Sequence, residues 1–237
     1  MPGLNEEITI FLKSQGASLV GFADLKEIDA EARDNFPYGI CIAAALDPKI
    51  ISELKIGPTA AYRAEYKRAN LLLDSLALKL AQFLADKGYK AKVRPATFEE
   101  DQSTLTAKLP HKTVATRAGL GWIGKSALLV TRSYGPAIRL VTVLTDAPVR
   151  PGEPVNESLC AHCTHCIDAC PAHAHTGAKW EAGIKREDIF NAFACREMAR
   201  NLSQKLINET ISICGLCITA CPWTQRYLRN SQNTITN

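Results

Sequence analysis

The spacing of the cysteines constrains this chain more than any other feature. Four cysteines between residues 160 and 170 follow the pattern C-x2-C-x2-C-x3-C and are followed by proline, the spacing of bacterial 4Fe-4S ferredoxins. A second run, residues 214–222, reads C-x2-C-x3-C-P and has one cysteine fewer, for which Cys195 is the obvious replacement. The eight thiols are enough for two cubane clusters. The sequence therefore predicts a double 4Fe-4S protein.

In ferredoxins with two clusters, the last cysteine of one run binds the other cluster. This exchange predicts that one cluster is held by Cys160, Cys163, Cys166 and Cys221. The other is then held by Cys170, Cys195, Cys214 and Cys217. Structural zinc is the alternative, because tetrahedral zinc sites also use C-x2-C pairs, but the closely spaced run ending in Cys-Pro favours iron and sulfide.

Four histidines lie among these cysteines: His162, His165, His173 and His175. Because eight cysteines already satisfy two clusters, we expect the histidines to modulate the cluster potentials rather than to bind iron. Cys41 lies in an apolar segment and is expected to be a buried, unreactive thiol.

Charge and cysteine usage indicate a cytoplasmic protein. Lys and Arg number 28 against 24 Asp and Glu, and a net charge of +4 is small for a dedicated nucleic-acid binder. The first residues lack the features of a secretory signal, and the longest uncharged run, residues 210–225, is too short to cross a bilayer. The odd count of nine cysteines excludes complete disulfide pairing.

The apolar pattern before residue 156 predicts an α/β domain. Asn5 is expected to cap a first helix that closes at Gly16, and apolar residues three or four apart predict a long helix over residues 59–87. Buried strands are expected over residues 17–25, 38–46, 89–97, 125–131 and 137–146. A proline-rich stretch places a domain boundary near residue 156. We therefore predict an α/β domain over residues 1–155 and a ferredoxin-like domain over residues 156–237, with helices at 185–200 and around Cys217.

A glycine-rich loop precedes the last expected strands. Gly119, Gly121 and Gly124 spell G-x-G-x-x-G, the dinucleotide-binding fingerprint, but no hydrophobic strand precedes them and a strand-like segment follows. The glycines are explained either by a tight turn or by close approach of the backbone to a large flat ligand, with Trp122 packing alongside.

The segment RAGLGWIGKSALLVT, the strand ending in LTDAP and the two cysteine runs resemble epoxyqueuosine reductase and its relatives, including the reductive dehalogenases. This resemblance implies cobalamin bound to an α/β domain of nitroreductase-like architecture, with a mixed sheet and flanking helices, beside a ferredoxin-like domain. It implies that the cluster of Cys170, Cys195, Cys214 and Cys217 lies nearer the cobalt and reduces it. It also implies a corrin-binding loop formed by Gly119, Leu120, Gly121, Trp122, Ile123, Gly124 and Lys125.

The chain departs from the family pattern at the proton donor. An aspartate precedes the glycine loop by about fourteen residues in epoxyqueuosine reductase; a count without gaps places Leu105 there, and the nearest acid is Asp101, in a run with Glu99 and Glu100. We take His111 as the first candidate proton donor and Asp101 as the second. The chain also ends fifteen residues after Pro222, without the helical-repeat extension of the tRNA-acting enzymes.

The function expected from the sequence is electron transfer through two clusters to a bound corrinoid for reductive chemistry on a small substrate. The alternatives are an activating module that reduces a corrinoid carried by another protein, and a ferredoxin-type carrier. Expected partners are a ferredoxin- or flavodoxin-type electron donor and a small molecule or corrinoid protein. We expect no membrane partner and regard tRNA as an unlikely one.

Overall fold

The computed structural model describes residues 3–97, 101 and 103–235. The chain divides into two compact units. The first contains Met1–Ala45, Arg68–Gly121 and Arg139–Val155, and the second contains Leu46–Lys67, Trp122–Ile138 and Asn156–Asn237. One limit of these units coincides with the boundary expected after residue 155, and the second unit also includes earlier segments. The division into residues 1–155 and 156–237 therefore stays a prediction. Glu99 and Glu100 lie outside the described residues.

The first unit is built on a four-stranded sheet with the strand order β1-β2-β6-β3. Its strands are β1 (Leu19–Asp24), β2 (Tyr38–Ala45), β3 (Ala91–Arg94) and β6 (Ile138–Thr145). β1 pairs antiparallel with β2, with Gly21 opposite Cys41, and β3 pairs antiparallel with β6, with Val93 opposite Val143. The predicted α/β class is confirmed, and each of these strands lies within its expected segment.

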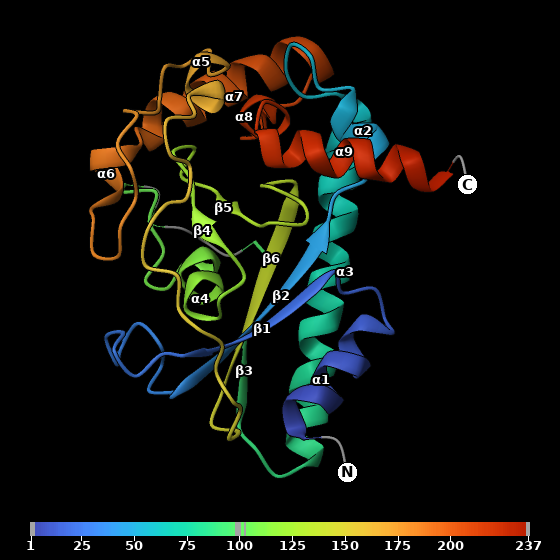
Figure 1. The fold of residues 1–237 in the computed structure, drawn as a ribbon, viewed down its shortest axis with the longest axis vertical. Coiled ribbons are helices and arrows are strands. Elements are labelled where there is room, and N and C mark those ends of the chain that lie inside the picture. The colour runs from blue at the N-terminus through green and yellow to red at the C-terminus, as the bar shows by residue number, and fades with distance from the viewer. Residues whose placement is uncertain (1–2, 98–100, 102, 236–237) are drawn as a thin grey trace. The chain divides into compact units, whose positions relative to one another are not determined.

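Within the first unit, helix α1 (Leu4–Lys13) lies next to the sheet and beside the part of helix α3 (Ala60–Asp86) that follows residue 67 (Figure 1). The rings of Phe11 and Phe83 stack with centroids 4.9 Å apart. The prediction that Asn5 caps α1 is wrong, since the N-cap is Gly3. The Asn5 side chain instead donates to the carbonyl of Arg150 at 2.7 Å and accepts its N–H at 2.9 Å. A tertiary contact has replaced the local cap.

Small residues in β1 and β2 make room for helix α4 (His111–Arg117), which the sequence analysis did not foresee. A Cβ atom at Gly21 would lie 2.6 Å from Leu120, just beyond the end of α4, and one at Gly39 would lie 2.9 Å from Val114. Because side chains alternate along a strand, Cys41 shares this face of β2 with Gly39. Cys41 is fully buried, and burial raises the pKa of its thiol to about 12, so the thiol stays protonated.

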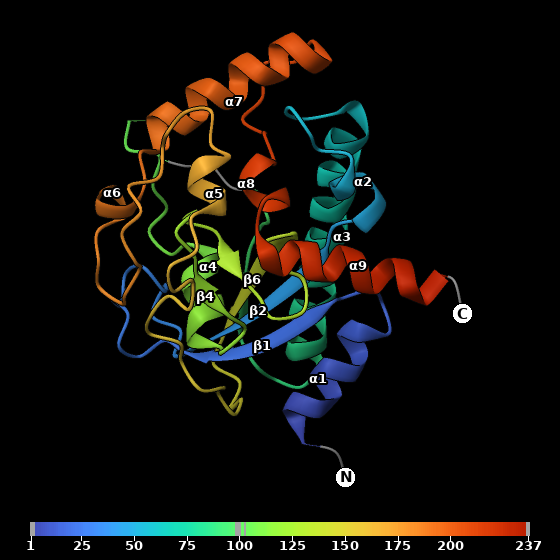
Figure 2. The same cartoon turned by 45° about the horizontal axis from the view of Figure 1, so that its top comes forward.

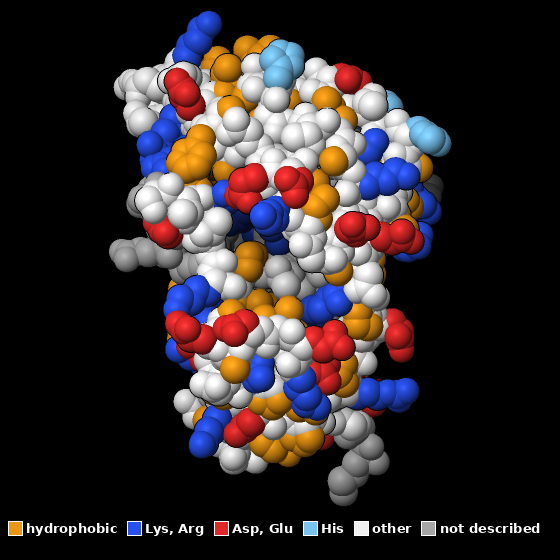
Figure 3. All heavy atoms as spheres, turned by 90° about the vertical axis from the view of Figure 1, so that its left-hand side faces the viewer, with side chains coloured by type: hydrophobic (Ala, Val, Ile, Leu, Met, Phe, Trp, Pro, Cys, Tyr) orange, Lys and Arg blue, Asp and Glu red, His pale blue; other side chains and the backbone are white. Residues whose placement is uncertain are grey.

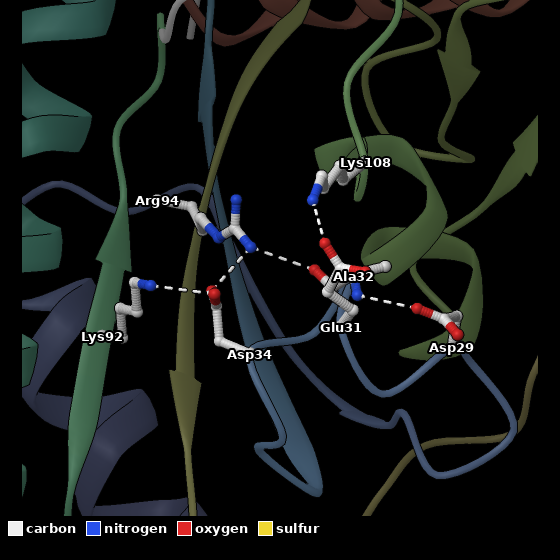
Figure 4. Close-up of polar contacts among 7 residues, drawn as sticks. All are labelled: Asp29, Glu31, Ala32, Asp34, Lys92, Arg94 and Lys108. Carbon is white, nitrogen blue, oxygen red and sulfur yellow. Dashed lines mark hydrogen bonds and ion pairs between the residues drawn. The ribbon is translucent and has the colours of Figure 1, made fainter.

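An ion-pair network fastens the loop after β1 to β3 (Figure 4). Asp34 accepts from Nη2 of Arg94 at 2.6 Å and pairs with Nζ of Lys92 at 2.9 Å. Arg94 also donates to the carbonyl of Ala32 at 3.0 Å. Burial opposes ionisation of Asp34, but the two cations outweigh it and hold the pKa of this carboxyl below its ordinary value.

The second unit consists mainly of short elements. They are α2 (Pro48–Ser52), β4 (Trp122–Ile123), β5 (Leu129–Val130), α5 (His165–Asp168), α6 (Arg186–Ile189), α7 (Ala192–Ile207), α8 (Leu216–Thr219) and α9 (Pro222–Ile235). α8 lies between α5 and α9 (Figure 2). A small apolar cluster joins Ile123, Ala127, Trp180 and Ile189.

For two elements of the second unit, the predicted length is wrong. The strand expected over residues 125–131 is limited to Leu129–Val130, because Gly124 to Ala127 form a turn that is closed by the Ala127 N–H donating to the Gly124 carbonyl at 2.8 Å. The helix expected over residues 185–200 is divided into α6 and α7. The division falls at Asn191, whose side chain accepts the N–H of Ala194 at 3.0 Å and begins α7 as an N-cap.

Acidic and basic side chains are interspersed on the face shown in Figure 3, which carries no field of a single sign. Among the described helices, none combines the length and the apolar character needed to cross a bilayer.

Gly119 and Gly88 form a matched pair for testing the turn after α4. Both have a positive φ, +72° and +85°, at which any other L-residue pays about 1–2 kcal/mol. A Cβ atom at Gly119 would also lie 2.6 Å from the carbonyl oxygen of Glu153, whereas one at Gly88 would meet nothing within 4 Å. We expect Gly119→Ala to lower the melting temperature clearly more than Gly88→Ala, because relieving the contact costs about 1–3 kcal/mol more. Equal losses in the two variants would contradict the turn geometry.

Candidate functional site

The first cysteine run lies in the second unit on a turn that leads into α5. The N–H of Cys163 donates to the carbonyl of Cys160 at 3.0 Å, and α5 then places Cys166 within the helix and Cys170 just beyond it. The N–H of Cys170 donates to the carbonyl of Ile167 at 3.1 Å. Closely spaced turns therefore bring the thiols of this run into one small region.

The second run lies around α8 of the same unit. Gly215, with φ +89°, begins α8 directly after Cys214, and Cys217 lies in the helix. Cys221 follows α8. Burial raises the pKa of its thiol, and the hydrogen bonds that its sulfur accepts from the backbone N–H groups of Trp223 and Thr224 oppose this rise. The remaining cysteine, Cys195, lies in the first turn of α7.

The electrostatic neighbours of the thiols fall into two groups. Beyond burial, the pKa of Cys166 is raised by Cys160, Cys221 and Cys163. The pKa of Cys195 is likewise raised by burial and then by Cys170 and Cys214. Cys217 has Cys214, Cys195 and Cys170 as neighbours, together with Cys166 of the other group. The structure thus brings together the two sets that the ligand exchange predicts, and the assignment of each thiol to iron stays a prediction.

The surroundings of these thiols keep them protonated in the absence of a metal centre. Burial and then the neighbouring thiols raise the pKa of Cys166 and of Cys195 to about 11. Cluster binding requires deprotonated thiols, so it releases their protons, and the positive iron ions compensate the thiolate charge. Eight sulfur donors in two groups fit the chemistry of two cubane clusters. In the described residues, no group of three or more His, Cys, Asp or Glu side chains has an arrangement that could hold a metal ion.

The second half of the glycine loop contacts the first cysteine run. Nε1 of Trp122 donates to Sγ of Cys160 at 3.4 Å, and Nζ of Lys125 donates to the carbonyl of Cys163 at 3.1 Å. A Cβ atom at Gly124 would lie 3.4 Å from the same Cys160 sulfur and 2.8 Å from Val130. Hydrogen bonds to cluster sulfurs influence reduction potentials, so Trp122 would tune the cluster that Cys160 is predicted to bind.

The rest of the loop has packing roles within the chain. Gly119 lies against the backbone of Glu153, Leu120 packs over Gly21, and Ile123 belongs to the apolar cluster of the second unit. Gly119 and Gly124 are therefore required by contacts inside the protein. Corrin binding by Gly119, Leu120, Gly121, Trp122, Ile123, Gly124 and Lys125 stays a prediction.

His111 begins α4 and uses both ring nitrogens. Nε2 lies 3.0 Å from the carbonyl of Pro95, which can only accept, so Nε2 carries the proton and Nδ1 accepts from Oγ1 of Thr142 at 2.9 Å. Burial lowers the pKa of His111 to about 4; the Pro95 bond opposes this, and the charges of Arg139 and Arg94 add to it. These contacts favour a structural role for His111, and its catalytic role stays a prediction.

Asp101 lies on the surface in the turn that contains Leu105. The N–H of Leu105 donates to the Asp101 carbonyl at 2.6 Å. The side chain of Asp101 accepts from the hydroxyl of Ser103 at 2.6 Å and from its N–H at 2.8 Å. These bonds lower the pKa of the carboxyl. Asp101, the nearest acid, thus lies in the same turn as Leu105, the position that the count without gaps assigns to the family aspartate.

The histidines among the cysteines have different surroundings. Nδ1 of His165 lies 3.3 Å from Sγ of Cys163, within reach of a cluster ligand. His175 is buried and stacks on Phe190 with ring centroids 5.5 Å apart, and burial lowers its pKa.

Residues 159–224 match the family model described as a 4Fe-4S double cluster binding domain. This match confirms the prediction of two 4Fe-4S clusters rather than structural zinc. The chain thus carries an iron–sulfur domain of the redox type, which occupies most of the residues after 156.

The resemblance read from the sequence is confirmed by curated relatives. The chain is 27% identical over 259 residues to the epoxyqueuosine reductase of Listeria monocytogenes serovar 1/2a, covering 94% of this chain and 65% of the relative. It is 34% identical over 127 residues to the epoxyqueuosine reductase of Synechococcus sp. strain CC9605, covering 53% of this chain and 39% of the relative. The chain therefore spans less than two thirds of these relatives.

Solved structures share the fold. An epoxyqueuosine reductase crystallised with an epoxyqueuosine-modified tRNA-Tyr stem loop gives a TM-score of 0.62 at 22% identity, over 94% of this chain and 65% of that one. A reductive dehalogenase whose structure suggests a mechanism for B12-dependent dehalogenation gives a TM-score of 0.71 at 20% identity. The match covers 99% of this chain and 34% of the dehalogenase chain.

The expectation that tRNA is an unlikely partner is wrong. The similar enzyme of known structure was solved with a modified tRNA stem loop, and the curated relatives carry the same enzyme name. The expectation rested on the low net charge and on the two departures from the family pattern, and neither describes the local surface that a nucleic acid meets.

The state of His111 can be measured directly. Because its pKa lies near 4, we expect the imidazole to stay neutral, with the proton on Nε2, from about pH 8 down to about pH 5.5. An unfolded histidine titrates near 6.5, so the stability that this residue contributes is complete above about pH 6.5 and is lost as the pH falls toward 4. Imidazole nitrogen shifts by NMR, assigned with His111→Gln, provide the measurement. Protonation of His111 near pH 6.5 would contradict the geometry.

The hydrogen bond from Trp122 to Cys160 can be used to test which cluster Cys170 binds. Replacing Cys170 or Cys166 with alanine should leave about four iron per chain in each variant, since each change removes one cubane. In Cys170→Ala, the cluster of Cys160 survives, so adding Trp122→Phe should lower its potential by about 20–60 mV, the equivalent of one lost hydrogen bond. In Cys166→Ala, adding Trp122→Phe should leave the potential unchanged. No effect of Trp122→Phe in either variant, measured by redox titration, would show that Cys170 binds with its sequence neighbours, because both cysteine replacements would then remove the cluster of Cys160.

Proposed function

We propose that this chain is a cobalamin-dependent iron–sulfur reductase that reduces an epoxide on a tRNA nucleoside. The observation that carries the proposal is the double-cluster domain, in which eight thiols form two groups, in a chain that resembles epoxyqueuosine reductases. Two clusters supply electrons one at a time, and reduction of an epoxide consumes two electrons and two protons. A protein of this kind must therefore deliver both.

The residues of the second unit serve the electron path. The two thiol groups would hold the clusters, and Trp122 donates a hydrogen bond to one sulfur of the Cys160 group. The ammonium of Lys125 lies against the Cys163 carbonyl, where its charge favours an anionic cluster. Cobalamin, when bound, supplies a metal centre that can be reduced to a strong nucleophile.

Cobalamin binding is supported by the resemblance of the loop rather than by its glycines. Gly119 and Gly124 are already needed for packing inside the chain. Gly121 is buried, and Gly119 is the exposed residue of the loop. These observations are compatible with the backbone of residues 119–121 approaching a ligand, and we assign no further geometry to it.

Proton delivery is better assigned to Asp101 than to His111. The proton of His111 is held by the Pro95 carbonyl, and its low pKa leaves it neutral. Asp101 is exposed in the turn that contains Leu105, the position matched to the family aspartate. Its carboxyl is stabilised as the anion in this structure, so it would need to be protonated at the moment of reaction.

A specific observation favours a second candidate, the activating module. Leu105 stands where the resemblance implies an acid, and both nitrogens of His111 are engaged. A protein without its own acid could still pass electrons to a corrinoid that another protein carries. The two functions differ in whether the isolated chain consumes substrate.

The proposal is tested with protein reconstituted anaerobically with iron, sulfide and cobalamin. We expect it to convert an epoxyqueuosine-modified tRNA stem loop to the reduced nucleoside in the presence of a reductant, as measured by nucleoside mass spectrometry. Asp101→Asn should lower the rate by about 10²-fold or more, whereas His111→Gln should change it little.

The controls separate the alternatives. Cobalamin that gives no spectral change on addition would exclude the cobalamin part of the proposal. Reduction of the added corrinoid without turnover of the stem loop would establish the activating module. Equal rates in the wild type and in Asp101→Asn would remove this residue as the proton donor.

A further inference from the structure

Two arginines flank one aromatic ring on the second unit. Arg132 follows β5, and Arg226 is the fifth residue of α9. Their guanidinium carbons lie 6.0 Å and 5.9 Å from the centroid of the Trp223 ring. Both arginines are exposed, Trp223 is partly buried, and within the described part of the chain neither arginine has a carboxylate partner.

The segments that carry these residues have no acidic side chain to neutralise them. Residues 122–138 and 210–237 contain Lys125, Arg132, Arg226 and Arg229 but no Asp or Glu. The chain as a whole has 24 acidic residues, so their absence here concentrates positive charge. Arg132, Trp223 and Arg226 thus form a basic aromatic patch.

The patch is connected to the thiols of one cluster group. The ring of Trp122 lies edge-on to that of Trp223, with centroids 5.5 Å apart and an interplanar angle of 75°. Nε1 of Trp122 contacts Sγ of Cys160 at 3.4 Å, and the backbone N–H of Trp223 contacts Cys221. A partner that covers Trp223 would therefore lie close to the cluster of Cys160 and Cys221, and electron transfer is fast only over short distances.

The geometry points to this patch as the docking site and electron-entry point for an acidic one-electron carrier protein of the ferredoxin or flavodoxin class. In each encounter the carrier loses one electron and the cluster held by Cys160 and Cys221 gains it, with no bond made or broken. The arginines attract the acidic surface of the carrier, and Trp223 supplies the contact nearest the thiols. The inference rests on the cluster assignment of the proposed function and is independent of the epoxide chemistry.

Arginine and tryptophan also suit the phosphates and bases of a nucleic acid. A carrier protein is favoured because the patch is attached through Trp122 and Trp223 to two thiols of the same group. Nucleic-acid binding is therefore treated as an outcome of the test.

The test uses the whole 237-residue chain with reconstituted clusters, and reduced plant-type ferredoxin, an acidic carrier, is the probe. The variant is Arg132→Glu with Arg226→Glu, and the matched control is Lys179→Glu with Lys205→Glu, which changes the net charge equally at exposed residues of the same unit. Iron content and the visible spectrum show that each variant is loaded. Stopped-flow absorbance gives the rate of cluster reduction, and titration gives the dissociation constant for oxidised ferredoxin.

We expect the arginine variant to reduce the second-order rate about tenfold at low ionic strength and to weaken binding similarly. The difference should shrink at about 0.3 M salt, because exposed charges are then screened. The control pair should lose less than about half of the rate. Reduction by methyl viologen, a small cation that needs no docking site, should be no slower in the arginine variant.

Equal losses in the two charge-reversal variants would overturn the docking site. So would an unchanged ferredoxin rate combined with weaker binding of a tRNA stem loop, which would assign the patch to nucleic acid. Arg132→Gln with Arg226→Gln should give an intermediate rate. If the protein fails to reduce the epoxide but the arginine variant still reacts more slowly with ferredoxin, the proposed function alone is refuted. If the protein reduces the epoxide but the arginine variant reacts with ferredoxin at the rate of the control pair, this inference alone is refuted.

Discussion

The packing of eight thiols into two groups is the constraint on which the second unit depends. Cys160 and Cys221 are separated by more than sixty residues of sequence, yet both are electrostatic neighbours of Cys166. Burial and the neighbouring thiols both oppose ionisation of Cys166 and Cys195, so these groups stay protonated until a metal centre binds. The surrounding elements α5, α6 and α8 have four residues each, too short to be stable as isolated helices, and the apolar cluster nearby is small. If the thiols bind the two clusters as predicted, metal–thiolate bonds join these short elements and add to the stability of this part of the chain.

The sequence was sufficient for features that are encoded locally. The cysteine spacing predicted the cluster domain because the ligands of one run lie within a few residues of one another. The periodic apolar residues predicted α3, and the short apolar runs predicted the strands of the first unit. α4 escaped notice because it is short and has no full apolar period, and its position depends on Gly21 and Gly39 in distant strands. Asn191 did carry a readable signal, since an asparagine N-cap explains why α6 and α7 are separate.

The candidate site was harder to predict because its decisive contacts join distant segments. The roles of Asn5 and His111 were assigned from their neighbours in sequence, whereas the actual partners are Arg150, 145 residues away, and Thr142, 31 residues away. The glycine loop shows the same effect. Its spacing suggested a ligand, but Gly119 is needed against Glu153 and Gly124 against Val130 and Cys160. One loop thus meets packing requirements that a sequence pattern cannot distinguish from ligand binding.

The local distribution of charge carries more information than the net charge. A net charge of +4 is modest, and the expectation that tRNA is an unlikely partner rested partly on it. Yet Coulomb interactions with a docked partner are screened within about 10 Å at ordinary salt, so a partner responds only to the charges near its contact surface. The charged side chains of residues 122–138 and 210–237 are all positive, whereas elsewhere Asp34 offsets part of the charge of Lys92 and Arg94 by pairing with both. The net charge therefore does not describe the surface that an individual partner meets, and arguments about anionic partners must be made from individual patches.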